Sequence, residues 1–239
     1  MDMNYEFEIE AIKNRHSVRQ YEDKRMDTVV VQKLLEKIQE LNQKGGLNIQ
    51  LIEEAGQTFN KLLNRAMGLG SAPSVIACVG KDTSDLDERV GYYGEQLVLF
   101  AQQLGLNTCW AGTFNHKKIP AKIEEGERLV IVIAIGYGVN PGKSRKTKSA
   151  VQVVGTTLDT PDWFNFGVEM ALLAPTAVNQ QKFKIDYQNG EVAISDQGGI
   201  LGKVDLGIVK YHFEVGAEYS KSQAERKSLD GKETTNFKE

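Results

Sequence analysis

The chain has 239 residues, and 41% of them are hydrophobic, which supplies a sizeable core and argues against a disordered protein. Its formal net charge is −3, with 29 Lys and Arg against 32 Asp and Glu, so no global field attracts nucleic acid or an anionic membrane. The two cysteines, Cys78 and Cys109, lack a Cys-x-x-Cys spacing, which argues against a disulfide framework or a zinc site. The acidic N-terminus and the lack of a long apolar run lead us to expect a cytoplasmic protein without a membrane partner.

The first part of the chain alternates helical and strand-like patterns. Apolar residues at helical spacing between Asp27 and Gly45 predict an amphipathic helix, and a second helix is expected over 92–104, ending at Gly105. Two apolar, β-branched runs at 75–80 and 129–136 predict central strands.

The second part begins after the basic segment NPGKSRKTK. Residues 163–173 predict a helix that ends at Ala174-Pro175, and 183–187 and 191–195 predict a hairpin around Asn189-Gly190. A last helix is expected over 207–218. The polar tail 220–239 has few apolar residues and is expected to be loosely ordered.

This order of elements favours an α+β fold, an α/β/α sandwich around a central, mainly antiparallel sheet. Several chemistries are excluded. The Gly202-Lys203 pair lacks the first glycine and the hydroxyl of a phosphate loop, and no G-x-G-x-x-G, H-E-x-x-H or G-x-S-x-G motif occurs. The three histidines have no spacing that suggests a shared metal.

The segment RHSVRQY carries a candidate anion site. Arg15, Ser17 and Arg19 alternate, so an extended backbone would direct two guanidinium groups and a hydroxyl at one phosphate. The alternative is an exposed basic turn paired to Glu10 or Glu22.

A second candidate segment, APTAVNQQ at 174–181, lies between a predicted helix and a predicted strand. Its amides can both donate and accept hydrogen bonds, which suits the edge of a heterocycle, and small residues beside Pro175 allow a flat ring to approach. The alternative is a helix stop with polar turn residues.

Together these segments resemble the FMN-dependent nitroreductase family. Arg15-His16-Ser17-Val18-Arg19 is similar to its N-terminal FMN motif, and APTAVNQQKF is similar to its A-P-S-x-x-N-x-Q-P-W segment. GYYGEQLVLFAQQLGLNTCWAGTF resembles its helix and flavin-facing loop, and LVIVIAIGYG with Lys143 and Arg145 resembles its last strand and phosphate contacts. The resemblance runs from residue 10 to about 218, and it implies a nitroreductase-like fold.

The resemblance also implies a set of FMN-binding residues. The phosphate would be held by the 15–17 segment and the basic residues after the last strand, with Arg19 near the ribityl chain and pyrimidine. The loop 110–113 would face the central ring, and the 175–179 segment would cover its other side or edge. The residues assigned in this way are Arg15, His16, Ser17, Arg19, Trp110, Ala111, Gly112, Thr113, Lys143, Arg145, Pro175, Thr176, Ala177 and Asn179.

One departure from the family concerns the order of the segments. The A-P-S-x-x-N segment ordinarily follows soon after the arginine motif and serves the partner subunit, whereas here it comes some 160 residues later, with Gln181-Lys182-Phe183 in place of Gln-Pro-Trp. We therefore expect a rearranged, single-chain pseudo-dimer (TM nitroreductase-like), either monomeric or a homodimer of such chains. Residues 1–157 would form the first half with the phosphate site, 158–219 the second half that completes the flavin site, and 220–239 the tail.

The implied reaction is ping-pong hydride transfer from NADH or NADPH to the flavin, and then to a small-molecule acceptor such as a nitroaromatic or a quinone. No residue is assigned a catalytic role, because the chemistry belongs to the flavin. The alternative is a non-catalytic flavin- or nucleotide-binding protein of the same fold. A nucleic-acid contact through the basic run 143–148 is not expected, because few aromatic residues interleave it.

Overall fold

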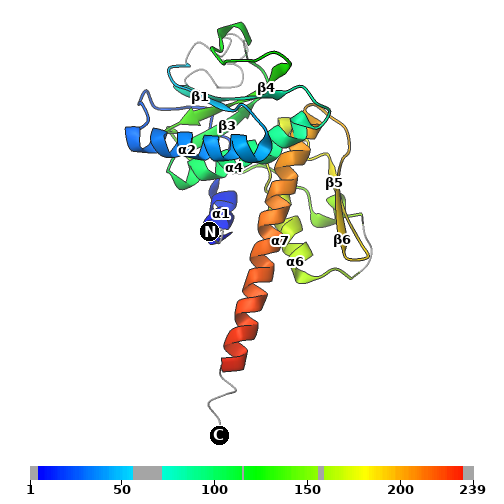
Figure 1. Cartoon of the computed structure of the whole chain (residues 1–239). Helices are drawn as coiled ribbons and strands as arrows, with labels where there is room; N and C mark the ends of the chain where they lie inside the picture. The colour runs from blue at the N-terminus through cyan, green and yellow to red at the C-terminus, as the bar shows by residue number, and fades with distance from the viewer. Residues whose placement is uncertain (1–4, 56–71, 115, 156–158, 234–239) are drawn as a thin grey trace.

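The computed structural model describes residues 5–55, 72–114, 116–155 and 159–233, the last seven of these and residue 117 by their backbone alone (Figure 1). The elements, in chain order, are α1 (Tyr5–Asn14), α2 (Thr28–Gly45), β1 (Gln50–Ile52), β2 (Ser74–Lys81), α4 (Leu86–Gln103), β3 (Asn107–Ala111), η1 (His116–Lys118), β4 (Glu127–Gly136), α5 (Ala150–Val153), α6 (Asp162–Leu172), η2 (Ala177–Asn179), β5 (Phe183–Gln188), β6 (Glu191–Asp196) and α7 (Gly202–Glu233).

A four-stranded antiparallel sheet forms the centre, in the order β1-β2-β4-β3. The two strands expected to be central, β2 and β4, lie side by side in the middle, with Ile76 opposite Ile133. Most of their residues are buried because both faces of the sheet are covered. The expected mixed α and β fold with an antiparallel central sheet is confirmed.

The two faces of this sheet pack against different kinds of segment. On one face, Ile76 and Ile133 belong to a core cluster with Leu34 of α2 and Leu97 of α4, and both helices lie along this face in Figure 1. On the other face, strand residues pack against the non-helical segment that contains Val18. The basic motif is therefore fastened to the sheet by its neighbours.

A close crossing of α4 and α7 joins the two parts of the chain. A Cβ added at Gly91 would overlap the carbonyl oxygen of Val204, and one added at Gly207 would overlap that of Glu88, so the backbones touch. Both glycines lie inside helices, which begin earlier than expected. The helix α4 begins at Leu86 rather than at residue 92, and α7 begins at Gly202 rather than at residue 207. Glycine weakens a helix in isolation, but here it is required for the contact.

The predicted hairpin forms, with Asn189 and Gly190 both at positive φ as a two-residue turn of this kind requires. It is a separate two-stranded sheet of β5 and β6 rather than part of the central one. Val154 forms a bridge to Ile185, and the hairpin lies beside α6 and α7 (Figure 1).

Residues 220–233, part of the tail expected to be loosely ordered, belong to α7, which continues to Glu233 and projects from the rest of the molecule (Figure 1). Lys221 forms an ion pair with Glu218 one turn earlier and lies over the Trp163 ring. Such pairs stabilise a polar part of a helix that lies beyond its buried turns. Residues 234–239 and the proposed boundary at 157/158 lie outside the described residues.

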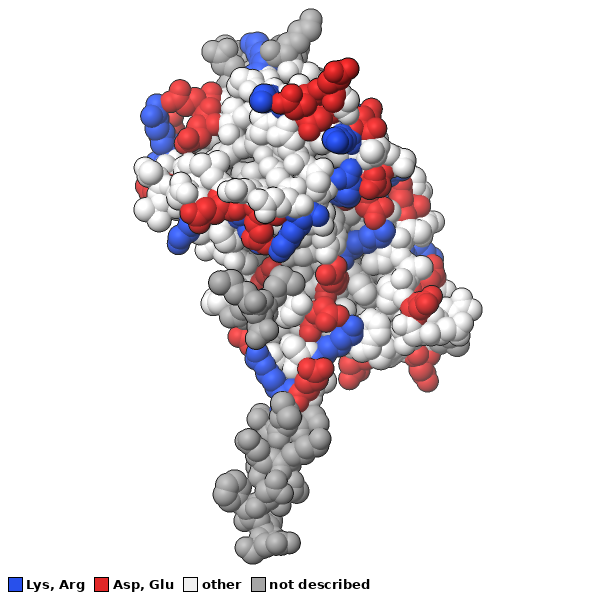
Figure 2. Space-filling model, viewed as in Figure 1, with Lys and Arg blue, Asp and Glu red and all other residues white. Residues whose placement is uncertain are grey.

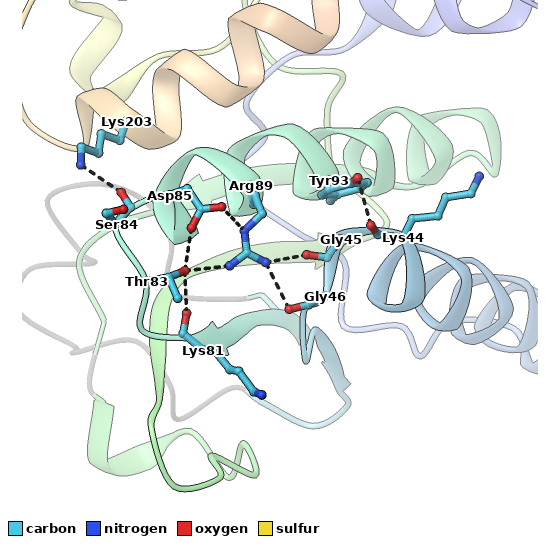
Figure 3. A network of polar contacts seen from close by, with 10 residues as sticks. All are labelled: Lys44, Gly45, Gly46, Lys81, Thr83, Ser84, Asp85, Arg89, Tyr93 and Lys203. Atoms are coloured by element: carbon cyan, nitrogen blue, oxygen red, sulfur yellow. Dashed lines mark hydrogen bonds and ion pairs between the residues drawn. The ribbon is translucent and has the colours of Figure 1, made fainter.

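Arg89 fastens the C-terminal end of α2 to α4 (Figure 3). Its Nη1 donates to the carbonyl oxygens of Gly45 (2.6 Å) and Gly46 (3.2 Å), and its Nη2 donates to Thr83 Oγ1. Its Nε lies 2.9 Å from Asp85 Oδ2. A cation at the last carbonyl groups of a helix is favourable, and this contact holds α2 against α4.

On the face shown in Figure 2, basic and acidic side chains are interspersed, and no field of one sign covers it. None of the helices in the described part of the chain is both long and apolar enough to cross a membrane.

Candidate functional site

The basic motif follows α1 and runs along the edge strand β3. The Val18 N–H donates to the Thr108 carbonyl oxygen at 3.0 Å, and Ser17 forms a parallel bridge to Thr108. Val18 is buried in the core cluster of the sheet, and the Tyr21 hydroxyl donates to the Val18 carbonyl oxygen at 2.7 Å. The buried valine therefore fixes the position of the polar residues on either side of it.

Arg15 is a buried cation without a carboxylate partner among the described residues. It is 7% exposed, its Nη2 lies 3.4 Å from Ser17 Oγ, and its buried Nε has no hydrogen-bond partner. The alternative pairing with Glu10 or Glu22 is not found. Burial of an unpaired charge is costly, so this arrangement favours an anion bound beside Arg15 and Ser17.

Arg145 joins the basic motif to the 174–181 segment. Its Nη1 donates to Asn179 Oδ1 at 2.6 Å, and its Nη2 donates to the carbonyl oxygens of Leu172 (3.1 Å) and Ala174 (2.5 Å) at the end of α6. Burial lowers the pKa of the Arg145 guanidinium, and the positive charge of Arg15 lowers it further. The two arginines, 130 positions apart in the sequence, therefore share one region of positive potential.

Lys143 lies close to the same region, because the chain before it packs on the basic motif. Gly142 has φ +83°, and a Cβ added there would be 2.7 Å from the Cβ of His16. Lys143 itself is exposed, and so is Arg19, whose Nη1 lies 3.4 Å from the Ser17 carbonyl oxygen. His16 and Ser17 are half-buried.

The 174–181 segment is a strained turn. Val178, Asn179 and Gln181 all have positive φ, which is uncommon for residues other than glycine and costly for a β-branched one. The Asn179 amide is engaged within the protein, since Oδ1 accepts from Arg145 and Nδ2 donates to the Lys146 carbonyl oxygen. Val178, in contrast, is 79% exposed at the tip. Asn179 thus shapes the turn and leaves other groups at its surface.

The other residues assigned to this segment differ in exposure. Pro175 is buried, whereas Thr176 and Ala177 are half-buried. Thr176 Oγ1 accepts a hydrogen bond from the Gln181 N–H at 3.0 Å.

Asp205 lies on the first turn of α7 and forms hydrogen bonds with the 174–181 segment. It was not identified from the sequence. Its carboxylate accepts from the Ala177 N–H at 2.9 Å and from Gln180 Nε2 at 2.8 Å. Burial raises the pKa of the Asp205 carboxyl to about 6, and the nearby charge of Asp196 adds to this, while the two hydrogen bonds oppose it. A single Asp in a Gly-rich stretch carried no signal for this role.

The segment 110–113 differs from the expected loop. Trp110 and Ala111 belong to strand β3, and only Gly112 and Thr113 follow it, both exposed. The Ala111 side chain is buried in the core cluster of the sheet that also contains Val18. The strand was missed because both of its faces are covered, which removes the alternation of apolar and polar residues.

Trp110 is half-buried, and its indole Nε1 donates to Glu95 Oε2 at 2.8 Å. Glu95 Oε1 in turn lies 2.8 Å from His212 Nε2, and both of these side chains are completely buried. His212 therefore lies inside the core. A carboxylate on the buried face of a helix, four residues after Gly91 and three before Val98, was the available signal. Cys78 and Cys109 are buried free thiols.

The site is thus a region of positive charge between β3, the 142–148 segment and the 174–181 turn. Among the described residues, no group of three or more His, Cys, Asp and Glu side chains is arranged to hold a metal ion. A phosphate group fits the donors present, because Arg15 offers a buried unpaired N–H beside the Ser17 hydroxyl.

Known proteins to which this chain is similar include nitroreductases. A family model described as "Putative TM nitroreductase" matches residues 8–217. A nitroreductase of Thermotoga maritima MSB8, described as putative, is 29% identical, with 90% of this chain and 84% of that chain covered and a TM-score of 0.62. A nitroreductase family protein of Streptococcus pneumoniae TIGR4 (16% identity, 62% and 98% covered, TM-score 0.49) and an FMN-dependent nitroreductase of Clostridium difficile R20291 (18%, 61% and 94%, 0.45) are more distant. No curated protein matches the chain.

The family model spans most of the chain, including the basic motif, β3 and the 174–181 turn. This chain belongs to the TM nitroreductase family.

Proposed function

We propose that this protein is an FMN-dependent oxidoreductase that accepts electrons from NADH or NADPH and passes them to a nitroaromatic, quinone or similar small molecule. Membership of the nitroreductase family supports the oxidoreductase class. The observation that carries the proposal is the buried Arg15 guanidinium, which has no carboxylate partner in the described part of the chain.

In this proposal Arg15 and Ser17 bind the FMN phosphate, with Lys143 at its exposed side. Arg145 adds positive charge and holds the turn through Asn179. His16 and Arg19 lie toward the ribityl chain and pyrimidine, Trp110 with the 111–113 segment forms one wall, and 175–179 forms the other. Bound FMN supplies the acceptance and donation of hydride.

The protein's own contribution is binding and electrostatics. Two guanidinium groups that form no ion pair with a described residue create a positive potential, which would stabilise the negative charge of a phosphate and of a reduced flavin. Because the sequence-distant segments come from a single chain, the site is complete without a partner subunit in this proposal.

Titration of FMN into the purified protein tests the proposal, with Arg15→Met as the diagnostic variant. We expect Arg15→Met to weaken FMN binding by about tenfold or more, since it removes charge-assisted hydrogen bonds. Without FMN the variant should be at least as stable as the wild type, because it removes a buried unpaired charge.

Arg128→Met is the matched control, since Arg128 forms ion pairs with Asp82 and Asp87. It should leave FMN affinity unchanged and lose stability. Anaerobic addition of NADH or NADPH should then bleach the bound flavin. FMN that binds without bleaching would support the non-catalytic alternative, and a wild type that binds no FMN would refute the proposal.

A further inference from the structure

A buried acidic residue and a buried histidine meet where α4 and α7 cross. Glu95 lies about one turn after Gly91, and His212 about one turn after Gly207, the two glycines at which the helix backbones touch. Both side chains are 0% exposed. The proposed flavin chemistry uses neither of them, yet a carboxylate is almost never fully buried unless something pairs with it.

The two residues form the middle of a chain of four hydrogen-bonding groups. Trp110 Nε1 donates to Glu95 Oε2 (2.8 Å), Glu95 Oε1 meets His212 Nε2 (2.8 Å), and His212 Nδ1 meets the Met170 carbonyl oxygen (3.1 Å). Trp110 and Glu95 belong to the first half of the chain, and Met170 and His212 to the second. The contacts therefore connect the two halves through the core.

The number of protons shared by these four hydrogen-bonding groups follows from the groups at the two ends. A carbonyl oxygen only accepts, so His212 Nδ1 must carry a proton toward Met170. The Glu95–His212 contact then needs one further proton, held either by the carboxyl or by the imidazole. In both cases the pair is net neutral, which explains how it is tolerated at 0% exposure.

Trp110 is held at two places by these helices. Its indole N–H is bonded to Glu95, and its ring lies on Gly94, where an added Cβ would be 2.5 Å from the ring atom Cη2. Only glycine at position 94 leaves room for the ring. The indole edge is thus fixed in the core, while the residue as a whole is half-buried at the end of β3.

The anchored indole lies close to the basic region. Trp110 is two residues after Thr108, which forms a bridge to Ser17 of the basic motif. We propose that Glu95 and His212 are positioning residues of the flavin site, in which Glu95 orients the Trp110 indole and His212 holds Glu95 in place. The role of these residues at the flavin site rests on the proposed function, whereas the anchoring of Trp110 does not.

Trp110 fluorescence tests the anchoring without any ligand. The chain contains two tryptophans, so Trp163→Phe leaves Trp110 as the sole emitter and keeps an aromatic ring at 163. In this background we compare Glu95→Leu with Glu95→Gln by iodide quenching and near-ultraviolet circular dichroism. Leucine removes the acceptor, whereas glutamine can accept from the indole and donate to His212 Nε2.

We expect Glu95→Leu to lose the protection of Trp110 from iodide and its near-ultraviolet signal, and Glu95→Gln to retain both. Equal quenching of the two variants and the parent protein would overturn the proposal. The fluorescence result does not depend on FMN. A failure of the proposed function would be seen separately, because the wild type would then not bind FMN.

A double-mutant cycle on FMN binding distinguishes positioning from general folding. In the native chain, Glu95→Leu should raise the FMN Kd by about tenfold and Glu95→Gln by less than about twofold. In a Trp110→Phe background the two substitutions should no longer differ, because Glu95 acts through the indole.

A Glu95→Leu effect that persists in the Trp110→Phe background would overturn the proposal. If Glu95→Leu fails to fold, Trp110→Phe alone decides the question, since it keeps the Glu95–His212 pair. A Trp110→Phe protein that binds FMN like the wild type would contradict the positioning role.

Discussion

Asp205 is a buried carboxyl group whose pKa should be visible in the stability of the protein. Its pKa is raised from 3.8 to about 6 in the folded state. A raised folded-state pKa means that the folded state binds the proton more tightly, so the associated stability is present below pH 3.8 and is lost as the pH rises through about 6. The full difference is on the order of 3 kcal/mol.

Asp205→Asn should remove this dependence while keeping one oxygen acceptor for the turn. The free energy of unfolding of the wild type, relative to that of the variant, should fall as the pH rises from 4 to 7, with urea unfolding as the measurement. The exposed Asp23 offers a matched control, Asp23→Asn. Parallel pH profiles of the wild type and Asp205→Asn would show that burial does not perturb this carboxyl.

For individual residues, type and spacing identified the basic motif in the sequence. The structure brings Arg15 and Arg145 within electrostatic reach of each other. Spacing could not reveal which donors remain available. The Arg145 guanidinium donates to the end of α6 and to Asn179, whereas Arg15 keeps a buried N–H that has no partner among the described residues. This difference depends on neighbours that are 27 to 34 positions away in the sequence.

Among the elements, the crossing of α4 and α7 offers a direct test of packing. In Gly91→Ala the new Cβ would meet the Val204 backbone oxygen, so a helix must move. We expect a loss of about 2 kcal/mol or more in the free energy of unfolding, although alanine is the better helix former by about 1 kcal/mol.

Gly105→Ala is the comparison for that measurement. A Cβ at Gly105 would meet nothing within 4 Å, so alanine there incurs only the cost of its positive φ, about 1–2 kcal/mol. Urea unfolding of both variants gives the comparison. A Gly91→Ala protein as stable as the wild type would mean that the helices are not in backbone contact.

Long elements in which apolar residues recur regularly or in a continuous run were predictable from the sequence. The helices α2 and α6 and the two central strands follow the apolar pattern that their burial requires. Strand β3 and the start of α4 were not. The strand is covered on both faces, and the helix begins with a stretch that contains Gly91 and Gly94, which lower helix propensity but fit Val204 and Trp110. Tertiary contacts override local preference at these positions.

For the whole molecule, we predict that one 26.6 kDa chain binds one FMN. The basic motif, β3 and the 174–181 turn, which carry the proposed contacts, meet within a single chain through Thr108 and Arg145. Sedimentation equilibrium with and without FMN measures both mass and stoichiometry. We expect one FMN per chain whether the protein is a monomer or a dimer. FMN binding that vanishes when a dimer dissociates would show that a partner subunit completes the site.

The amino-acid sequence by itself determined the fold class and indicated the segments of the proposed site, because burial patterns and charged motifs are local properties of the chain. Only the tertiary structure decided how those segments are used. The Glu95–His212 pair, the Asp205 support of the turn and the glycine crossing each join residues far apart in the sequence. Their energies depend on burial and on partner geometry, which arise only when these distant segments of the chain pack together.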